Sequence, residues 1–97
     1  MNKKTLHLVR FSPFINTDIE LCRDNLLADD SIVLIDDGCY TLNHQIFEEL
    51  QLSCQQIYVV EQHAIARGIT LANHSNGINL AKLNQLIFQY DNSVTWQ

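Results

Sequence analysis

Two short apolar runs limit the possible folds of this chain more than any other feature of its sequence. Residues 31–36 read Ser-Ile-Val-Leu-Ile-Asp, and residues 57–60 read Ile-Tyr-Val-Val. Neither run alternates between apolar and polar residues, so each predicts a strand that is covered on both faces. Strands of this kind occur mainly in parallel sheets that have helices on both sides. The two runs therefore predict an α/β fold.

Helical patterns separate these runs from further predicted strands, which lie at residues 5–9, 77–80 and 94–96. The first helix is expected to begin at Thr17, because Thr17 and Glu20 have the spacing of a capping box. The other helices are predicted at residues 42–50, 61–67 and 82–90. Gly68 is expected to end the third of these four helices, since the residue after a helix often needs a positive φ. The alternation predicts a three-layer α/β/α sandwich with a mainly parallel sheet of about five strands.

The composition fits one folded domain. The chain has 97 residues, is 46% hydrophobic and contains only 3 Gly and 1 Pro, so we expect a single domain over residues 1–97. No apolar run approaches the roughly 20 residues of a membrane span. The apolar stretch after Lys4 is interrupted by His7 and Arg10, unlike that of a signal peptide. We therefore expect a cytoplasmic protein with no membrane partner.

The charge argues against direct binding of nucleic acid. Eleven acidic against six basic residues give a net charge of −5 with neutral histidines. Contacts to a phosphate backbone require clustered lysine and arginine, and only one pair of basic residues is adjacent here. The chain is therefore not expected to contact nucleic acid by itself.

Sites in open parallel sheets form beyond the carboxyl ends of the strands. The residues expected near that edge form a possible crevice of His7, Asp37, Gly38, Cys39 and His63. No nucleophile motif, glycine-rich phosphate loop or metal-ligand spacing accompanies them, so we expect neither a metal nor a cofactor. His7 is more typical of a residue in or beside the sheet, whereas His63 is the better candidate for a polar contact. The crevice is a candidate site for a small ligand.

Three cysteines, an odd number without CxxC spacing, argue against a disulfide framework. Cys22 lies on the apolar face of the first predicted helix, which favours a packed thiol. The alternative is a catalytic thiolate that carries a persulfide, but Asp18 and Asp24 would raise its pKa. Cys39 follows a strand end beside two carboxylates, and Cys54 falls in a polar loop as an expected surface thiol.

Four segments are informative when they are taken in order. They are Thr5-Leu6-His7 with Ser12-Pro13, then 32–38, then 57–60 leading to 65–69, and Trp96 near the end. In this order they resemble the DsrH/TusB family of small sulfur-relay proteins, at matching length and over nearly the whole chain. The resemblance implies a compact α/β fold of the DsrE/F/H type with a five-stranded parallel sheet.

The resemblance also implies partners. Members of the family assemble with TusC-like and TusD-like subunits into a heterohexamer. That complex takes persulfide sulfur from a TusA-like donor and passes it to a TusE-like acceptor. The sulfur becomes the 2-thio group of the wobble uridine in certain tRNAs. Related DsrE, DsrF and DsrH proteins serve sulfur oxidation instead.

Two positions distinguish the possible roles within this family. The sulfur-bearing cysteine of TusD-like subunits precedes an Arg-Gly pair, and by its spacing from Arg67 that place is occupied by Val60. DsrH-like members carry a cysteine on the first helix, and Cys22 has the matching spacing from the turn at Asp37. The leading hypothesis is an accessory subunit of a cytoplasmic sulfurtransferase complex. The alternatives are a persulfide carrier that uses Cys22 and a small-ligand-binding α/β domain.

Overall fold

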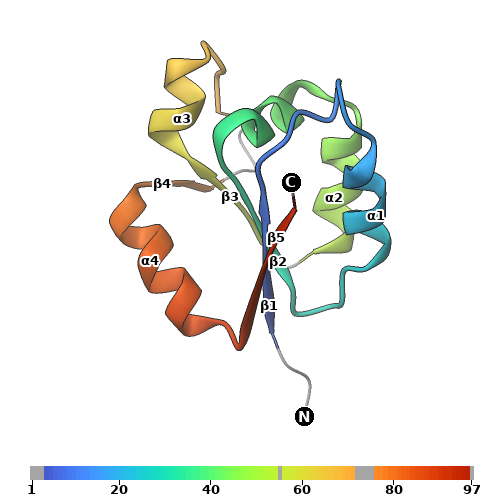
Figure 1. Cartoon of the computed structure of the whole chain (residues 1–97), viewed down its shortest axis with the longest axis vertical. Coiled ribbons are helices and arrows are strands. Elements are labelled where there is room, and N and C mark those ends of the chain that lie inside the picture. Colours follow the sequence, from blue (N-terminus) through green and yellow to red (C-terminus); the bar gives the residue numbers. More distant parts are fainter. Residues whose placement is uncertain (1–3, 55, 72–75, 97) are drawn as a thin grey trace.

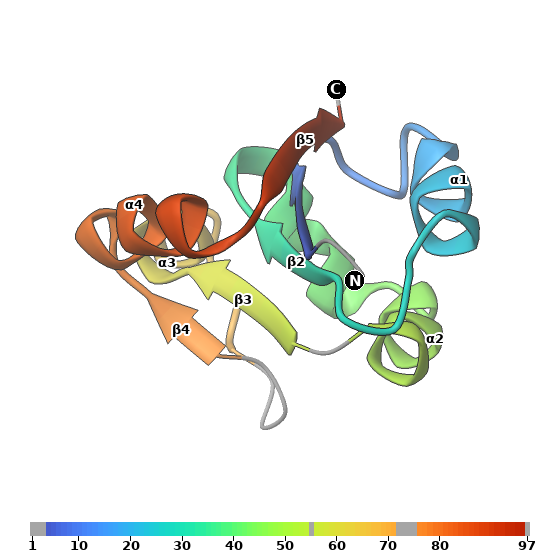
Figure 2. The same ribbon diagram turned by 90° about the horizontal axis from the view of Figure 1, so that it is seen from below.

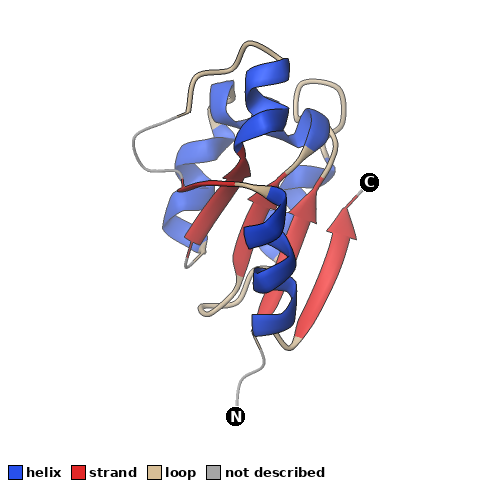
Figure 3. Ribbon diagram, turned by 90° about the vertical axis from the view of Figure 1, so that its left-hand side faces the viewer, coloured by secondary structure: helices blue, strands red, loops and turns tan. Residues whose placement is uncertain are grey.

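A parallel sheet with helices on both faces forms the protein in the computed structural model, which describes residues 4–54, 56–71 and 76–96 (Figure 1). The strand order is β4-β3-β2-β1-β5, and each neighbouring pair is parallel. The strands are β1 (Thr5–Val9), β2 (Ser31–Leu34), β3 (Gln56–Val60), β4 (Asn76–Ile78) and β5 (Asn92–Trp96). Their carboxyl ends share one edge of the sheet (Figure 3). The predicted α/β fold with a five-stranded parallel sheet is confirmed.

The direction of the connections decides which face each helix covers. Successive strands from β1 to β3 advance in one direction across the sheet, and right-handed crossovers place α1 (Asp18–Asp24) and α2 (Ile46–Ser53) on the same face. The connection from β4 back to β5 runs the other way, which places α4 (Leu80–Gln89) on the opposite face (Figures 1 and 2). The short helix α3 (Glu61–Ala66) contacts the 3-10 helix η1 (Asp36–Asn43). Helix α3 begins directly after β3, and η1 begins one residue after the end of β2.

Strand β2 is buried along its whole length because it lies at the centre of the sheet. Ile32 and Leu34 enter the core under α1 and α2, where Leu50 packs. Val33 faces the other way, into the core that Leu86 of α4 closes. Both faces of the strand therefore need apolar side chains, which explains why the sequence of this run lacks polar alternation.

The segment after β2 differs from the prediction. The sequence predicts a helix at 42–50, whereas the chain forms η1 over Asp36–Asn43 and then α2 over Ile46–Ser53. The turn into η1 is tight because the backbone N–H of Gly38 donates to the carbonyl of Ile35 at 2.8 Å. A Cβ at Gly38 would collide with the carbonyl oxygen of Val9. Only glycine lets the chain pass this close to β1.

The predicted capping box at the start of α1 is wrong. Thr17 makes no side-chain cap to this helix. Instead the Oδ1 of Asn16 accepts a hydrogen bond from the backbone N–H of Asp18 at 2.8 Å. An asparagine side chain that bonds the backbone two residues later supports the same turn by a different route.

The last two helices show how single residues set helix boundaries. Asn79 Oδ1 accepts from the backbone N–H of Lys82 at 2.8 Å, so α4 begins at Leu80 and β4 ends earlier than predicted. Gly68 has φ 69° and follows the end of α3, as predicted.

Candidate functional site

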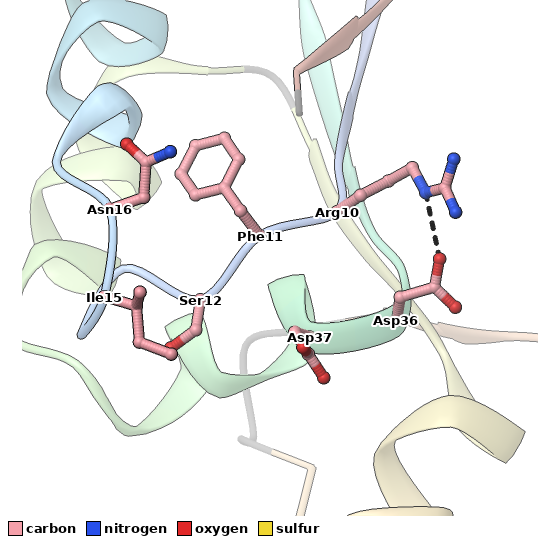
Figure 4. A pocket seen from close by; sticks show the side chains of 7 residues that line it. All are labelled: Arg10, Phe11, Ser12, Ile15, Asn16, Asp36 and Asp37. Carbon is pink, nitrogen blue, oxygen red and sulfur yellow. Dashed lines mark hydrogen bonds and ion pairs between the residues drawn. The ribbon is translucent and has the colours of Figure 1, made fainter.

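A pocket of about 520 Å³ opens at the carboxyl ends of β1 and β2 (Figure 4). Its lining comes from the loop after β1 and the start of η1, namely Arg10, Phe11, Ser12, Ile15, Asn16, Asp36 and Asp37. The Nε of Arg10 donates to the Oδ2 of Asp36 at 3.0 Å. The pocket thus combines apolar side chains with groups of both charges, in the size range of small-molecule sites.

Asp36 has an unusual backbone conformation at this edge. Its φ is 48°, in the left-handed region that side chains other than glycine adopt at a cost of about 1–2 kcal/mol. Its backbone N–H donates to the Nδ1 of His63 at 3.0 Å. Because Nδ1 accepts this bond, the proton of a neutral His63 lies on Nε2. The bonds to His63 and Arg10 offset the strain and hold the Asp36 carboxylate in place.

A second ion pair joins η1 to the end of α3. The Nε of Arg67 donates to the Oδ1 of Asp37 at 2.9 Å, and its Nη1 donates to the carbonyl of His63 at 3.1 Å. The hydrogen bond that Arg67 donates to Asp37 raises the pKa of Arg67 further above its already high value. We refer to Arg10, Asp36, Asp37, His63 and Arg67 as the carboxyl-edge network.

The structure brings only part of the predicted crevice to this edge. Asp37 lines the pocket, and His63 bonds the backbone of its neighbour Asp36. Gly38 is buried against the backbone of Val9. Cys39 is also buried, and its thiol donates to the carbonyl of Leu34 at 3.6 Å. Burial raises the pKa of Cys39 to about 11, so this residue contributes packing at the strand end.

His7 lies away from the pocket, in the middle of β1, where it is buried. The indole Nε1–H of Trp96 donates to the Nδ1 of His7 at 3.0 Å, so a neutral His7 carries its proton on Nε2. That Nε2 lies 3.0 Å from the Oδ2 of Asp30 and donates to it. We refer to His7, Asp30 and Trp96 as the buried His7 network.

Asp30 is the acceptor at the centre of this network. Its two carboxylate oxygens also accept from the backbone N–H groups of Thr5 and Leu27, each at 3.1 Å. Burial alone would raise the pKa of Asp30, but the hydrogen bonds from His7, Leu27 and Thr5 outweigh burial and lower the pKa below its ordinary value of 3.8. Asp30 therefore remains a carboxylate although it is buried.

Cys22 is fully buried on the inner side of α1. Its pKa is raised to about 12, first by burial and then by the nearby Cys54 and Asp30. Asp18 and Asp24 were expected to raise this pKa, but neither is among its causes. The cause matters because burial keeps the thiol protonated and also keeps reaction partners away from it.

Cys54 is partly buried, and the position of Val60 is wholly buried. Cys54 is half-buried and its thiol donates to the carbonyl of Leu50 at 3.1 Å, which corrects its interpretation as a surface thiol. Burial raises the pKa of Cys54 to about 11. Val60 is completely buried at the end of β3. A side chain at that position would need the packing to open before it could react.

Sequence reasoning missed two groups of residues. Asp30 is absent from the predicted crevice, because nothing in the sequence around it relates it to His7 or Trp96. The apolar wall of the pocket, Phe11 and Ile15, is also missed. Its position directly after the first predicted strand was the available signal, since that loop lies at the carboxyl edge of a parallel sheet.

The chemistry available at the pocket consists of hydrogen bonding and paired charge. Among the described residues, no three His, Cys, Asp or Glu side chains converge as metal ligands would. Over the same ranges, no helix has both the length and the apolar character needed to cross a membrane. The groups that remain for a ligand are the guanidinium of Arg10, the amide of Asn16 and the carboxylate of Asp37.

Two solved structures share this fold. The crystal structure of the ychN protein from E. coli has a TM-score of 0.73 and 17% sequence identity, covering 99% of this chain and 100% of that chain. The solution NMR structure of protein Tm0979 from Thermotoga maritima has a TM-score of 0.65 and 21% identity, covering 88% of this chain and 92% of that chain. At these identities the likeness establishes the fold alone.

Membership of a family rests on the sequence comparison. No curated protein sequence matches the chain. The family of DsrH-like proteins matches residues 11–93, which is most of the 97-residue chain. The matched range includes Cys22 and all of the pocket residues and the carboxyl-edge network except Arg10. The four ordered segments therefore indicated the correct family, and the chain belongs to the DsrH-like proteins.

Proposed function

We propose that the chain is an accessory subunit of a cytoplasmic sulfurtransferase complex of the TusBCD type. Such a complex delivers persulfide sulfur for 2-thiolation of the wobble uridine of tRNA. Membership of the DsrH-like family supports a role in sulfur relay. In this proposal TusC-like and TusD-like subunits complete a heterohexamer with the chain, while a TusA-like donor and a TusE-like acceptor exchange sulfur with the complex.

The observation that carries the accessory role is the burial of Cys22. In a relay step, a thiolate attacks the outer sulfur of a persulfide. A new S–S bond forms, the old one breaks, and the donor leaves as a thiolate. The attacking group must be both ionised and reachable. Cys22 is fully buried with its pKa raised to about 12. At neutral pH Cys22 is therefore a protonated thiol.

The remaining thiols support the same role. The pKa values of Cys39 and Cys54 are each raised to about 11 by burial. Sulfur chemistry is therefore assigned to a cysteine of the TusD-like partner, and this chain contributes surface and shape to the assembly. Its net charge of −5 disfavours direct contact with tRNA, so the acceptor would carry sulfur to the nucleic acid.

The test is a Cys22→Ser substitution in cells, with 2-thiouridine in tRNA measured by mass spectrometry. We expect thiolation close to the wild-type level, whereas loss of the cysteine of the TusD-like partner abolishes it. Iodoacetamide labelling of the native complex serves as a second readout, in which Cys22 stays unlabelled at pH 7. A large drop in thiolation with the complex still assembled would instead identify Cys22 as the persulfide carrier.

A small-ligand-binding role is the second candidate, and the pocket at the carboxyl edge favours it. Its volume of about 520 Å³ suits a small molecule, and Arg10 and Asp37 offer opposite charges at its wall. NMR titration of the isolated chain with a mixture of small metabolites tests this role. Shifts confined to the residues of the pocket would support it, and unchanged spectra would contradict it.

A further inference from the structure

The net charge of the chain is concentrated in one layer of the fold. Apart from the buried Asp30, helices α1 and α2 and the loop after α1 carry six acidic residues and one arginine, while the other five acids of the chain, Asp30 among them, balance its other five bases. The six acidic residues are Asp18, Glu20, Asp24, Asp29, Glu48 and Glu49. Without the buried Asp30, the α1/α2 layer therefore has a net charge of −5, which equals that of the whole chain.

The single arginine of this layer is already occupied. Arg23 donates to Glu49 at 3.0 Å and to Asp24 at 3.2 Å, so it joins α1 to α2 across their shared boundary. The two helices lie side by side on the same face of the sheet (Figures 1 and 2). Their other exposed carboxylates, Glu20 and Glu48, have no ion pair within the described residues.

Large apolar side chains stand exposed among these carboxylates. Leu21, Leu27 and Leu52 are 55%, 62% and 90% exposed. The opposite layer differs in charge, because α4 carries only Lys82 although its Phe88 is 89% exposed. Exposed apolar groups occur on both faces, but only the α1/α2 layer has a charge that specifies the chemistry of what could cover it.

We propose that the α1/α2 layer is a docking surface for a protein partner that presents lysine or arginine around apolar side chains. Such a partner gains attraction at long range and buries the exposed leucines on contact. A second copy of this chain would place two layers of charge −5 against each other. Nucleic acid and anionic membranes would be repelled for the same reason. A basic protein surface is the occupant that the charge favours.

The first experiment does not depend on the proposed function. The ¹⁵N-labelled chain is titrated with a synthetic amphipathic helix of lysine and leucine, and amide shifts are followed by NMR at 50 and 300 mM salt. We expect shifts confined to residues 18–29 and 46–53, with affinity at least about tenfold weaker at the higher salt. The double variant Leu21→Ser/Leu52→Ser should weaken binding about tenfold as well. Shifts centred on α4 or β5, or affinity unchanged by the leucine substitutions, would overturn the docking surface.

The second experiment uses natural partners and rests on the proposed function for their choice. The chain is co-expressed with the TusC-like and TusD-like subunits and the TusA-like donor of its own organism, and co-purified proteins are quantified. The variant Glu20→Lys/Glu48→Lys should reduce retention of one partner at least about tenfold. The control, Asn84→Lys/Gln85→Lys, also introduces two lysines, at exposed positions of α4, and should leave retention unchanged. An NMR spectrum of each variant verifies its fold.

The outcomes separate the two proposals. If the complex forms and both lysine variants behave like the wild type, the docking surface is wrong and the proposed function stands. If the wild-type chain retains no partner, the proposed function is contradicted, and the peptide titration alone decides the docking surface.

Discussion

Two polar networks in this protein have the same hydrogen-bond length but very different surroundings. His7 lies 3.0 Å from Asp30, and Arg10 lies 3.0 Å from Asp36. The side chains of the first pair are 6% and 2% exposed, whereas those of the second are 49% and 37% exposed. Distance alone would rank the two contacts as equal. Burial ranks them differently, because a buried group that loses its partner has no water to replace it.

The difference in exposure indicates different roles for the two networks. The buried His7 network connects β1, β5 and the loop before β2, which are three segments far apart in the sequence. The carboxyl-edge network lies where a ligand or partner would arrive, and its exposed ion pairs can rearrange at little cost. The first network therefore stabilises the fold, and the second is available for binding.

The largest expected effect comes from Asp30→Ala. This change leaves the Nε2–H of His7 and the backbone N–H groups of Thr5 and Leu27 without their acceptor in a buried place. We expect the free energy of unfolding to fall by about 3 kcal/mol or more, as measured by urea titration. The matched change Asp37→Ala at the carboxyl edge should reduce it by only about 0.5 kcal/mol. Equal effects of the two changes would contradict the comparison.

The next effect tests whether the carboxyl edge is held by backbone packing rather than by its ion pairs. Gly38→Ala places a Cβ against the carbonyl oxygen of Val9, and we expect a loss of about 2–3 kcal/mol in thermal unfolding. Gly68→Ala is the control, because its Cβ would meet open space and only the positive φ disfavours it. That change should cost about 1 kcal/mol. A tolerated Gly38→Ala would show that η1 can move away from β1.

A smaller effect depends on pH. The pKa of Asp30 is lower in the folded chain than its ordinary value of 3.8. The ionised Asp30 therefore stabilises the folded state fully above that value, and this stabilisation is lost as the pH falls through the folded pKa. The difference in unfolding free energy between the wild type and Asp30→Asn should therefore be greatest above about pH 5 and shrink toward pH 3. Fluorescence of Trp96, the only tryptophan, reports unfolding. A difference that is constant with pH would rule out this linkage.

The smallest effect is expected for Arg10→Gln. Both partners of the Arg10 ion pair are substantially exposed, so the change should alter the free energy of unfolding by at most about 0.5 kcal/mol. The measurement is chemical denaturation at low and high salt. Added salt should reduce the difference in the free energy of unfolding between the wild type and Arg10→Gln. A loss above about 1.5 kcal/mol would place the pair among the structural contacts of the fold.

Much of the fold follows from local patterns. The runs at 31–36 and 57–60 lack polar alternation because both faces of a central strand are buried, so sequence identifies β2 and β3 directly. Gly68 is recognisable because it follows a helical pattern. The helix boundaries near residues 42 and 80 are less predictable. They depend on the approach of Gly38 to β1 and on the cap formed by Asn79. Both are contacts of the folded chain, and the helical propensity of the local sequence does not reveal them.

The candidate site divides in the same way. The sequence alone determined that polar residues follow the strands at one edge of a parallel sheet, because the direction of the strands puts all their carboxyl ends together. The sequence favoured a place in or beside the sheet for His7, but only the tertiary structure identified its partners, since Asp30 and Trp96 are 23 and 89 residues away. The apolar face of the first predicted helix indicated a packed Cys22, but only the tertiary structure showed that its burial is complete and that α1 and α2 share one charged layer. Local patterns report the preference of each segment, whereas burial and charge are properties of the surface that the assembled segments create.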